Sequence, residues 1–380
     1  MPSSTRTICP IITRDIGSDG GTPMTKPAVV FGGPSDEHDI SILTGLQISH
    51  ALKDVHVFYW SKGGEWFQVD PESEAADYVD GPPRKARTVN LIPEVGQGYV
   101  AKKPIPISAV INACHGGPGE DGTLQGIFDL AGIKYTGPGQ AASALGMDKF
   151  AFGGVMAAAG LPTLSRALLA SSDAEPPAFS GPYIVKPRFG GSSIGIEVVE
   201  DWPTAIALFK TSSYYASGGV VEPFIEESRD LQMAVRTWPS LEMSAIEAPI
   251  RSGGRIYSYN QKYLAWGGEV SGGRELPAVI DPATDKALRD LARRVVGAAG
   301  LRGICRIDFL EKDSELWVNE VNTIPGSMGA YLWIDPPIAR PALFQAMLDE
   351  AIASPVRRFS VTGADGTALR SAGTISNKLG

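Results

Sequence analysis

Two short apolar runs, each followed at once by glycines and then by a helix-like segment, constrain the fold of this chain most strongly. Residues 28–31 run into Gly32-Gly33, and residues 107–113 run into CHGGPGEDG. Each run has the length and composition of a buried strand, and each glycine cluster marks a turn. Residues 35–52 and 123–131 then favour helices. Strands that alternate with helices predict a parallel, doubly wound sheet.

The composition and hydrophobic pattern of the sequence change near residues 147 and 237. A chain of 380 residues has room for two or three domains. The first 26 residues contain no apolar core of the length that a secretory signal needs, so we expect a disordered leader there, or a true start at Met24. The expected division is a leader at residues 1–26, domains at 27–145, 146–237 and 238–353, and a polar tail at 354–380.

Composition excludes several classes of protein. The net charge of −8 argues against a chain that coats nucleic acid. Three widely separated cysteines, Cys9, Cys114 and Cys305, make a disulfide framework and a structural zinc site improbable and fit a reducing compartment. No stretch approaches the roughly 18 apolar residues of a membrane span. We therefore expect a cytoplasmic protein that acts on neither membranes nor nucleic acids.

A run of alternating polar residues near the C-terminus suggests a metal site. In the segments RID and NEVN, Arg306 and Asp308 share one face of a strand, and Glu320 and Asn322 share one face of the next. If a hairpin joins the two faces, the two carboxylates and the amide form a set of hard oxygen ligands suited to magnesium. This convergence requires an odd number of residues in the hairpin loop. The alternative is a solvated strand pair with salt bridges, which the neighbouring apolar residues disfavour.

The loop FGGSSIG, residues 189–195, lies between two expected strands. Its glycines let backbone amides point at a phosphate, Ser192 and Ser193 add hydroxyl donors, and Lys186 adds a cation just before it. On composition alone, a plain flexible turn is the more frequent explanation of such a loop. The loop HGGPGEDG, residues 115–122, stands where ligands collect in an open parallel sheet, although a capped helix start is the competing explanation. The GxGxxG fingerprint is absent, which disfavours a dinucleotide oxidoreductase.

Eight of these segments occur in a recognisable order. They are FGGPSDEHDIS, HGGPGEDGTLQGIFDLAGIKYTG, ALGMDK, VKPRFGGSSIG, VEPFI, KY, RIDF and NEVNTIPG. Together they resemble the D-alanine–D-alanine ligase family of the ATP-grasp enzymes over about residues 28–350. The resemblance implies α/β and α+β architecture, with a Rossmann-like domain at 27–145 and two ATP-grasp subdomains at 146–237 and 238–353. It also implies that ATP activates one carboxylate as an acyl phosphate, which an amine then attacks.

The resemblance assigns roles residue by residue. Around ATP it places Lys149, Lys186, Ser192, Ser193, Glu222, Phe224, Ile225, Asp230 and Lys262. As ligands of two magnesium ions it places Asp308, Glu320 and Asn322. To the substrates and the reaction it assigns Asp39, His115, Glu120, Ser192, Tyr263, Arg306, Gly326, Ser327 and Tyr331. In this scheme Arg306 and the Gly326 backbone stabilise the oxyanion, and Asp39, Ser192 and Tyr263 link the lid loop to the substrate site.

Three positions depart from the family pattern. The family usually has glutamate where this chain has Asp39, which would meet the first substrate's ammonium, and where it has Asp230. Where the family usually has a serine that binds the second substrate's carboxylate, the sequence SMGAYLW places Tyr331. These changes favour a ligase with an acceptor other than D-alanine, whereas the family's usual activity favours authentic D-alanine–D-alanine ligation. The resemblance also implies a homodimer with amino acids as substrates.

A function of another class stays open at this point. A non-catalytic, ATP-binding regulator could share the fold. Such a protein would have lost a phosphate-binding lysine or a metal ligand, and this sequence keeps Lys149, Lys186, Lys262, Asp308, Glu320 and Asn322. The sequence therefore favours the enzyme over the regulator.

Overall fold

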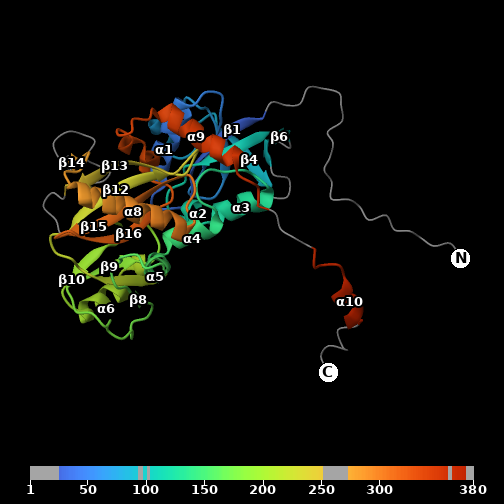
Figure 1. Ribbon diagram of the computed structural model, residues 1–380. Coiled ribbons are helices and arrows are strands. Elements are labelled where there is room, and N and C mark those ends of the chain that lie inside the picture. The colour runs from blue at the N-terminus through green and yellow to red at the C-terminus, as the bar shows by residue number, and fades with distance from the viewer. Residues whose placement is uncertain (1–24, 93–96, 101–102, 251–272, 358–361, 374–380) are drawn as a thin grey trace.

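The computed structural model describes residues 25–92, 97–100, 103–250, 273–357 and 362–373. The strands in these ranges form three sheets, of seven, four and five strands. Figure 1 shows the five-stranded sheet between the other two. The predicted mixture of α/β and α+β architecture is therefore confirmed.

The seven-stranded sheet belongs to the N-terminal part of the chain. Its strands are β1 (Lys26–Gly32), β2 (His56–Trp60), β3 (Trp66–Val69), β4 (Arg87–Ile92), β5 (Gln97–Val100), β6 (Lys103–Ile105) and β7 (Ile107–Asn112). They lie in the order β6-β5-β4-β3-β2-β1-β7. Only β1 runs parallel to its neighbours β2 and β7, and the remaining pairs are antiparallel. The expected all-parallel sheet was wrong beyond β2, because the described residues between β2 and β6 contain no α-helix for a parallel crossover.

Helix α1 (His38–Ala51) packs directly on β1. Its Gly45 makes the close approach possible, because a Cβ there would lie 2.1 Å from the Phe31 ring. Helices α2 (Gly117–Glu120) and α3 (Thr123–Ala131) follow β7. The loops before α1 and α2 therefore meet at the carboxyl ends of β1 and β7, where open sheets bind ligands.

The four-stranded sheet has the order β10-β9-β11-β8. Its strands are β8 (Ala167–Leu169), β9 (Tyr183–Pro187), β10 (Glu197–Val199) and β11 (Gly219–Pro223), and the neighbouring helices are α4 (Gln140–Met147), α5 (Lys149–Ala158) and α6 (Trp202–Thr211). The short 3₁₀ helices among the described residues are η1 (Ala75–Tyr78), η3 (Ser213–Tyr215) and η5 (Gly326–Leu332). The Asp148 side chain caps α5 by accepting the N–H groups of Phe150 and Ala151.

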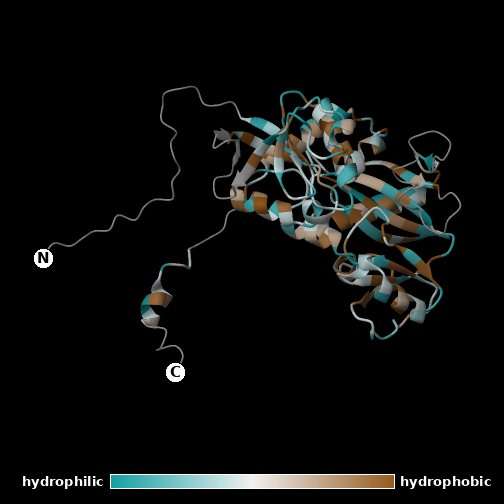
Figure 2. Ribbon diagram, turned by 180° about the vertical axis from the view of Figure 1, so that it is seen from behind, coloured by the Kyte–Doolittle hydropathy of each residue, from teal (hydrophilic) through white to brown (hydrophobic). Residues whose placement is uncertain are grey.

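The five-stranded sheet has the order β14-β13-β12-β15-β16. Its strands are β12 (Arg229–Arg236), β13 (Glu242–Pro249), β14 (Arg274–Glu275), β15 (Ile304–Lys312) and β16 (Glu315–Asn322). Helix α8 (Pro282–Ala299) buries Leu288, Ala292 and Val295 in the same core as β12 and β15. Figure 2 shows the apolar residues concentrated on these strands and on the helices that cover them.

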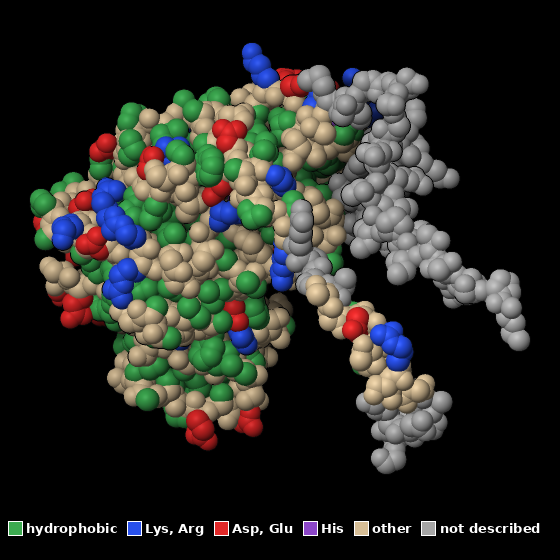
Figure 3. All heavy atoms as spheres, turned by 45° about the vertical axis from the view of Figure 1, so that its right-hand side comes forward, with side chains coloured by type: hydrophobic (Ala, Val, Ile, Leu, Met, Phe, Trp, Pro, Cys, Tyr) green, Lys and Arg blue, Asp and Glu red, His purple; other side chains and the backbone are tan. Residues whose placement is uncertain are grey.

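The chain then returns to the first sheet. Helix α9 (Arg340–Ala353) packs on β7 and places Leu343 and Phe344 in the N-terminal core. The short helix α10 (Thr367–Ala372), within the predicted tail, stands away from the body (Figure 1). Figure 3 shows basic and acidic side chains interspersed over one face of the molecule. The segment between β16 and α9 thus connects the C-terminal sheet to the N-terminal one.

Candidate active site

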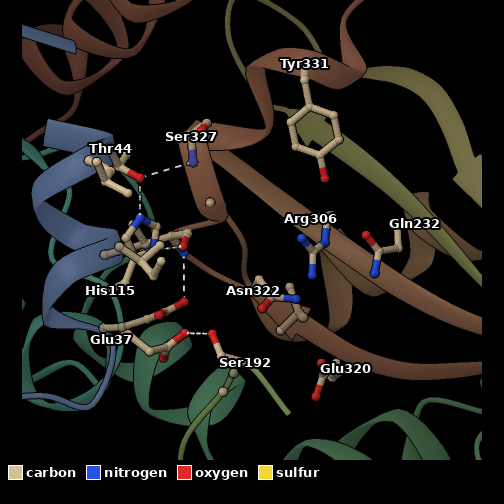
Figure 4. Close-up of a pocket in the computed structure, with 18 of the residues that line it drawn as sticks. Glu37, Thr44, His115, Ser192, Gln232, Arg306, Glu320, Asn322, Ser327 and Tyr331 are labelled. Atoms are coloured by element: carbon tan, nitrogen blue, oxygen red, sulfur yellow. Dashed lines mark hydrogen bonds between the residues drawn. The ribbon is translucent and has the colours of Figure 1, made fainter. Parts of the chain in front are cut away.

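A cavity of 270 Å³ lies where the three parts of the chain meet. Its walls come from α1 and the loop before it, from the loop after β7, from the glycine loop after β9, and from the five-stranded sheet (Figure 4). The predicted site residues that line it are His115, Glu120, Lys149, Ser192, Arg306, Glu320, Asn322, Gly326, Ser327 and Tyr331. The structure therefore brings together residues that lie more than 280 positions apart in the sequence, as between Thr44 and Ser327.

The polar residues predicted on two neighbouring strands do face one another. In the β15–β16 pair, Asp308 lies opposite Glu320 and Arg306 lies opposite Asn322. Arg306 holds Asp308 through two bonds, Nε to Oδ1 at 2.7 Å and Nη2 to Oδ2 at 2.8 Å. The Asn322 amide nitrogen lies 3.2 Å from Asp308 Oδ2. Two carboxylates and one amide on a shared surface match the hard oxygen donors that magnesium takes.

The hairpin that brings these side chains together differs from the predicted one. The hairpin loop holds two residues, Asp313 and Ser314, both at positive φ of 51° and 68°, as a type I′ turn requires. An even loop puts Asp308 out of phase with Glu320. A register shift between Asp308 and Phe309 leaves Asn319 as an extra residue on β16, and this bulge restores the phase. The expectation of an odd loop was wrong because a bulge supplies the extra residue instead.

No group of three or more His, Cys, Asp and Glu side chains able to hold a metal occurs among the described residues. The predicted set has only two carboxylates, so it falls short of that number. Its donors nevertheless fit magnesium, which keeps several waters and binds through one or two carboxylates together with substrate phosphates.

A smaller cavity of 90 Å³ lies beyond Glu320 and Gln232, which line both cavities. Most of the residues predicted to surround ATP line it: Lys186, Ser193, Glu222, Phe224, Ile225 and Asp230. The side chain of Glu222 is 1% exposed and is held by two cations, with Lys186 Nζ at 2.7 Å and Arg166 Nε at 2.8 Å. Glu222 therefore anchors Lys186, and the hinge that follows it lines the cavity.

The glycine loop is fastened on two sides. Lys149 Nζ donates to the Gly190 carbonyl, and the Ser192 hydroxyl donates to the Glu37 carboxylate. Ser192 and Ser193 have φ of 55° and 59°, the left-handed conformation that turns successive amides toward one side. Burial lowers the pKa of Lys149 although Glu320 opposes the shift. The loop thus contributes to both cavities, with Ser192 lining the larger one and Ser193 lining the smaller one.

Glu37, and not Asp39, is the carboxylate of the first loop that faces the cavity. The Asp39 side chain is 79% exposed and lies 3.4 Å from Lys62 Nζ at the surface. Glu37 is 9% exposed, lines the cavity and accepts from Ser192. The assignment of Asp39 was wrong, because α1 begins at His38 and turns the next residue outward. Lys262 and Tyr263 lie outside the described residues.

Buried side chains of the N-terminal part of the chain form hydrogen bonds with the backbone of the segment after β16. His115 Nδ1 lies 2.7 Å from the Ile324 carbonyl, and Glu120 Oε1 accepts the Ile324 N–H at 2.9 Å. Burial lowers the pKa of His115 to about 4. Burial, helped by the charge of Glu37, raises the pKa of Glu120 to about 7. His115 and Glu120 therefore lie at the cavity, where they bind backbone as well as line the wall.

Tyr331 lies at the far end of the cavity (Figure 4). Its ring lies under the Arg274 guanidinium, 5.1 Å from the ring centre, and Arg274 Nη1 lies 3.3 Å from Glu247 Oε1. Burial raises the pKa of the buried Glu247 carboxyl although Arg274 opposes the shift. Glu247 and Arg274 were missed from the sequence, as were Thr44, Arg166 and Gln232. Glu37 was also missed, and it is the one of these residues that the sequence could have indicated, because it lies within the SDEHDIS motif.

Comparisons with known proteins agree over most of the chain. The model described as "D-ala D-ala ligase N-terminus" matches residues 26–138, and that described as "D-ala D-ala ligase C-terminus" matches residues 157–348. D-alanine–D-alanine ligases of Mycobacterium sp. (strain KMS) and Mycolicibacterium vanbaalenii are both 32% identical to this chain. Each alignment covers 87% of this chain, and 96% and 98% of the two relatives respectively.

Solved structures give the same fold. "VanG D-Ala:D-Ser Ligase from Enterococcus faecalis" aligns with a TM-score of 0.71 at 24% identity, over 86% of this chain and 99% of that one. The D-alanine–D-alanine ligase from Coxiella burnetii aligns with a TM-score of 0.73 at 22% identity, over 87% and 95%. Within the described residues, no helix is long and apolar enough to cross a membrane.

Proposed function

Because this chain belongs to the D-alanine–D-alanine ligase family of ATP-grasp enzymes, which are ATP-dependent and form ADP, we propose that it joins two amino acids, the acceptor being other than D-alanine. The donor carboxylate attacks the γ-phosphorus of ATP, the bond to the bridging oxygen breaks, and ADP leaves. The acceptor amine then attacks the acyl carbon, the bond to the phosphate oxygen breaks, and an amide and inorganic phosphate result. One proton is released from the acceptor ammonium.

Binding of ATP is assigned to the smaller cavity and the glycine loop. We propose that Lys186 and Lys149 meet the phosphates, that the backbone after Glu222 meets the base, and that Asp230 meets the ribose. Magnesium, held by Asp308, Glu320 and Asn322, would neutralise charge on the phosphates. The backbone amides of Ser192 and Ser193 supply preorganised donors, and such electrostatic preorganisation is the main contribution a protein makes to phosphoryl transfer.

The donor amino acid is assigned to the end of the larger cavity near the N-terminal domain. There the Glu37 carboxylate can accept from an ammonium, while Arg306 and the Gly326 amide can stabilise the oxyanion. Neutral His115 adds no positive charge at this end, because burial holds its pKa near 4. The donor carboxylate would then lie toward Glu320 and the γ-phosphate, which is the orientation that in-line attack needs.

The observation that carries the proposal for the acceptor is the group formed by Tyr331, Arg274 and Glu247. A serine hydroxyl at position 331 would donate to an acceptor carboxylate. The phenol that replaces it extends much further from the backbone and lies within electrostatic reach of the Glu247 carboxylate, which raises the pKa of Tyr331 after the larger effect of burial. A second carboxylate beside Glu247 would be repelled, so this wall suits a polar group on the acceptor's side chain and not its α-carboxylate.

A panel of acceptors tests this proposal. D-Alanine is supplied as donor, each candidate amino acid as acceptor, and phosphate release and product mass are measured for the wild type and for Tyr331→Ser. We expect at least one acceptor to exceed D-alanine by about tenfold or more in kcat/KM, a difference of about 1.4 kcal/mol. We also expect Tyr331→Ser to shift the preference toward D-alanine. Strong turnover with D-alanine alone, unaltered by Tyr331→Ser, would contradict the proposal and indicate authentic D-alanine–D-alanine ligation.

Three further assignments rest on the resemblance. We propose that the domain limits are 27–145, 146–237 and 238–353, that the protein forms a homodimer through residues 27–145, and that it acts in the cytoplasm. The seven-stranded sheet lies in the first segment and the four-stranded sheet in the second, which supports the limit near residue 146. Strand β12 of the five-stranded sheet lies before residue 238, which favours a second limit ahead of β12.

A further inference from the structure

The five residues from Thr323 to Ser327 connect the metal-ligand strand to the acceptor wall, and they are held from outside. Ile324 is bound through both its backbone groups, its N–H by Glu120 at 2.9 Å and its carbonyl by His115 at 2.7 Å. The Ser327 N–H donates to the Thr44 hydroxyl at 3.1 Å. Gly326, whose amide is assigned to the oxyanion, therefore lies between two anchored residues.

Thr44 joins two of these contacts into one chain of hydrogen bonds (Figure 4). A carbonyl can only accept, so His115 Nδ1 must carry the ring proton that points at Ile324. His115 is neutral because burial lowers its pKa to about 4, and its Nε2 is then an acceptor. Thr44 lies 2.8 Å from that nitrogen and is therefore the donor. The direction of every proton in the chain is fixed, from Ser327 to Thr44, to His115 and to Ile324.

The backbone is strained from Ser327 onward, the residue whose N–H contacts Thr44. Ser327, Met328 and Gly329 have φ of 50°, 52° and 61°, three consecutive residues in the left-handed region. A non-glycine residue there costs on the order of 1–3 kcal/mol and persists only where its surroundings fix it. Tyr331 lies two residues further on. A contact at the first residue of the strained run therefore influences where the acceptor wall lies.

The position of Thr44 is itself rigid. It is 2% exposed and lies in the middle of α1, next to Gly45, which brings the helix against Phe31. We propose that Thr44 is a positioning residue for the second half of the reaction, in which the acceptor amine attacks the acyl phosphate. It accepts from the Ser327 amide and donates to His115 Nε2, and so it keeps the Gly326 amide directed at the oxyanion. This proposal rests on the proposed function.

The test compares two substitutions of similar size. Thr44→Val keeps the shape of the side chain and removes its hydrogen bonds, whereas Thr44→Ser keeps the hydroxyl. The first half-reaction is measured with the donor amino acid alone, as scrambling of ¹⁸O between the bridging and non-bridging positions of labelled ATP. The second half is measured as steady-state ligation with the acceptor varied.

We expect Thr44→Val to lower the kcat of ligation by about 10- to 100-fold, the size of effect that a displaced reacting group produces. Isotope scrambling should stay within about twofold of wild type, and Thr44→Ser should restore most of the ligation rate. Ser49→Ala is the matched control, because Ser49 is a buried hydroxyl of the same helix that bonds the Leu46 carbonyl of its own helix. Its kcat should stay near that of wild type.

Two results would overturn the inference. One is an unchanged kcat in Thr44→Val, and the other is an equal loss in scrambling and ligation, which would indicate general damage to the site. If Thr44→Val does not fold, as judged by thermal unfolding, Thr44→Ala takes its place in the same comparison. Failure of the proposed function is a separate outcome, since the wild type would then show no scrambling with any amino acid.

Discussion

Glu222 is the side chain whose replacement should have the largest effect on stability. It is 1% exposed and forms ion pairs with two nearly buried cations, Lys186 at 2.7 Å, which also donates a hydrogen bond, and Arg166 at 2.8 Å. Glu222→Gln keeps the shape and removes the charge. Both cations are then left in the interior without their counter-ion, which is the costly way to break a buried ion pair.

The size of the loss in unfolding free energy depends on the hydrogen bonds that Lys186 and Arg166 keep in Glu222→Gln. Removing one member of a buried pair typically costs about 3–5 kcal/mol. Here Lys186 keeps the Asn319 side-chain oxygen at 3.1 Å, and Arg166 keeps the carbonyls of Lys149 and Asn319. These neutral acceptors compensate part of the loss, so we expect the lower end of that range, about 3 kcal/mol in the free energy of unfolding.

The stability difference between wild type and Glu222→Gln should depend on pH, in a direction set by the pKa of Glu222. Burial alone would raise the pKa of Glu222, but Lys186 and Arg166 outweigh it and hold the pKa below the ordinary 4.5. The stabilisation from the charge is therefore complete above pH 4.5 and is lost as the pH falls through the native pKa. Urea unfolding of wild type and Glu222→Gln, followed by tryptophan fluorescence at pH 7.5 and 4.0, should show the difference shrinking at the lower pH. A loss under about 1 kcal/mol at pH 7.5, with an unaltered m-value, would refute the reasoning.

Two further predictions concern the other carboxylates. Glu37→Gln should raise the KM for the donor amino acid about tenfold or more in steady-state ligation, whereas Asp39→Asn should leave it within about twofold, and the reverse order would restore the assignment from the sequence. Glu120 has its pKa raised from 4.5 to about 7, so the wild type should lose about 3 kcal/mol of unfolding free energy as the pH rises through that window. Glu120→Gln should remove this slope in urea titrations, and an unchanged slope would show that another group titrates.

The order of motifs predicted the fold and the reaction class, because each motif is a short continuous segment whose local chemistry is visible in the sequence. Helix α3 was predicted over the residues at which it occurs, and the pairing of Asp308 with Glu320 was confirmed. Orientation within a motif was harder to predict. Glu37 and Asp39 are two residues apart in one acidic segment, and only the start of α1 decides which one faces the cavity.

Contacts between distant segments could not be predicted at all. Thr44 is one polar residue in a helix that has no clear apolar stripe, and nothing in its neighbourhood indicates Ser327 as its partner. Glu247 and Arg274 reach Tyr331 only because β13 pairs with β14 beside the segment that follows β16. Such contacts depend on the packing of whole sheets, which the periodicity of a single segment does not encode.

The bulge on β16 connects the stability of the core to the geometry of the metal site. Asn319 is the extra residue that brings Glu320 into phase with Asp308. Its side chain accepts from Lys186 and its carbonyl accepts from Arg166, the same two cations that neutralise Glu222. The buried charges therefore do more than stabilise the fold: they hold the backbone in the irregular conformation that the two carboxylates require. An apolar cluster of equal volume could replace their contribution to stability, but it would leave the polar groups of Asn319 without partners and release the bulge.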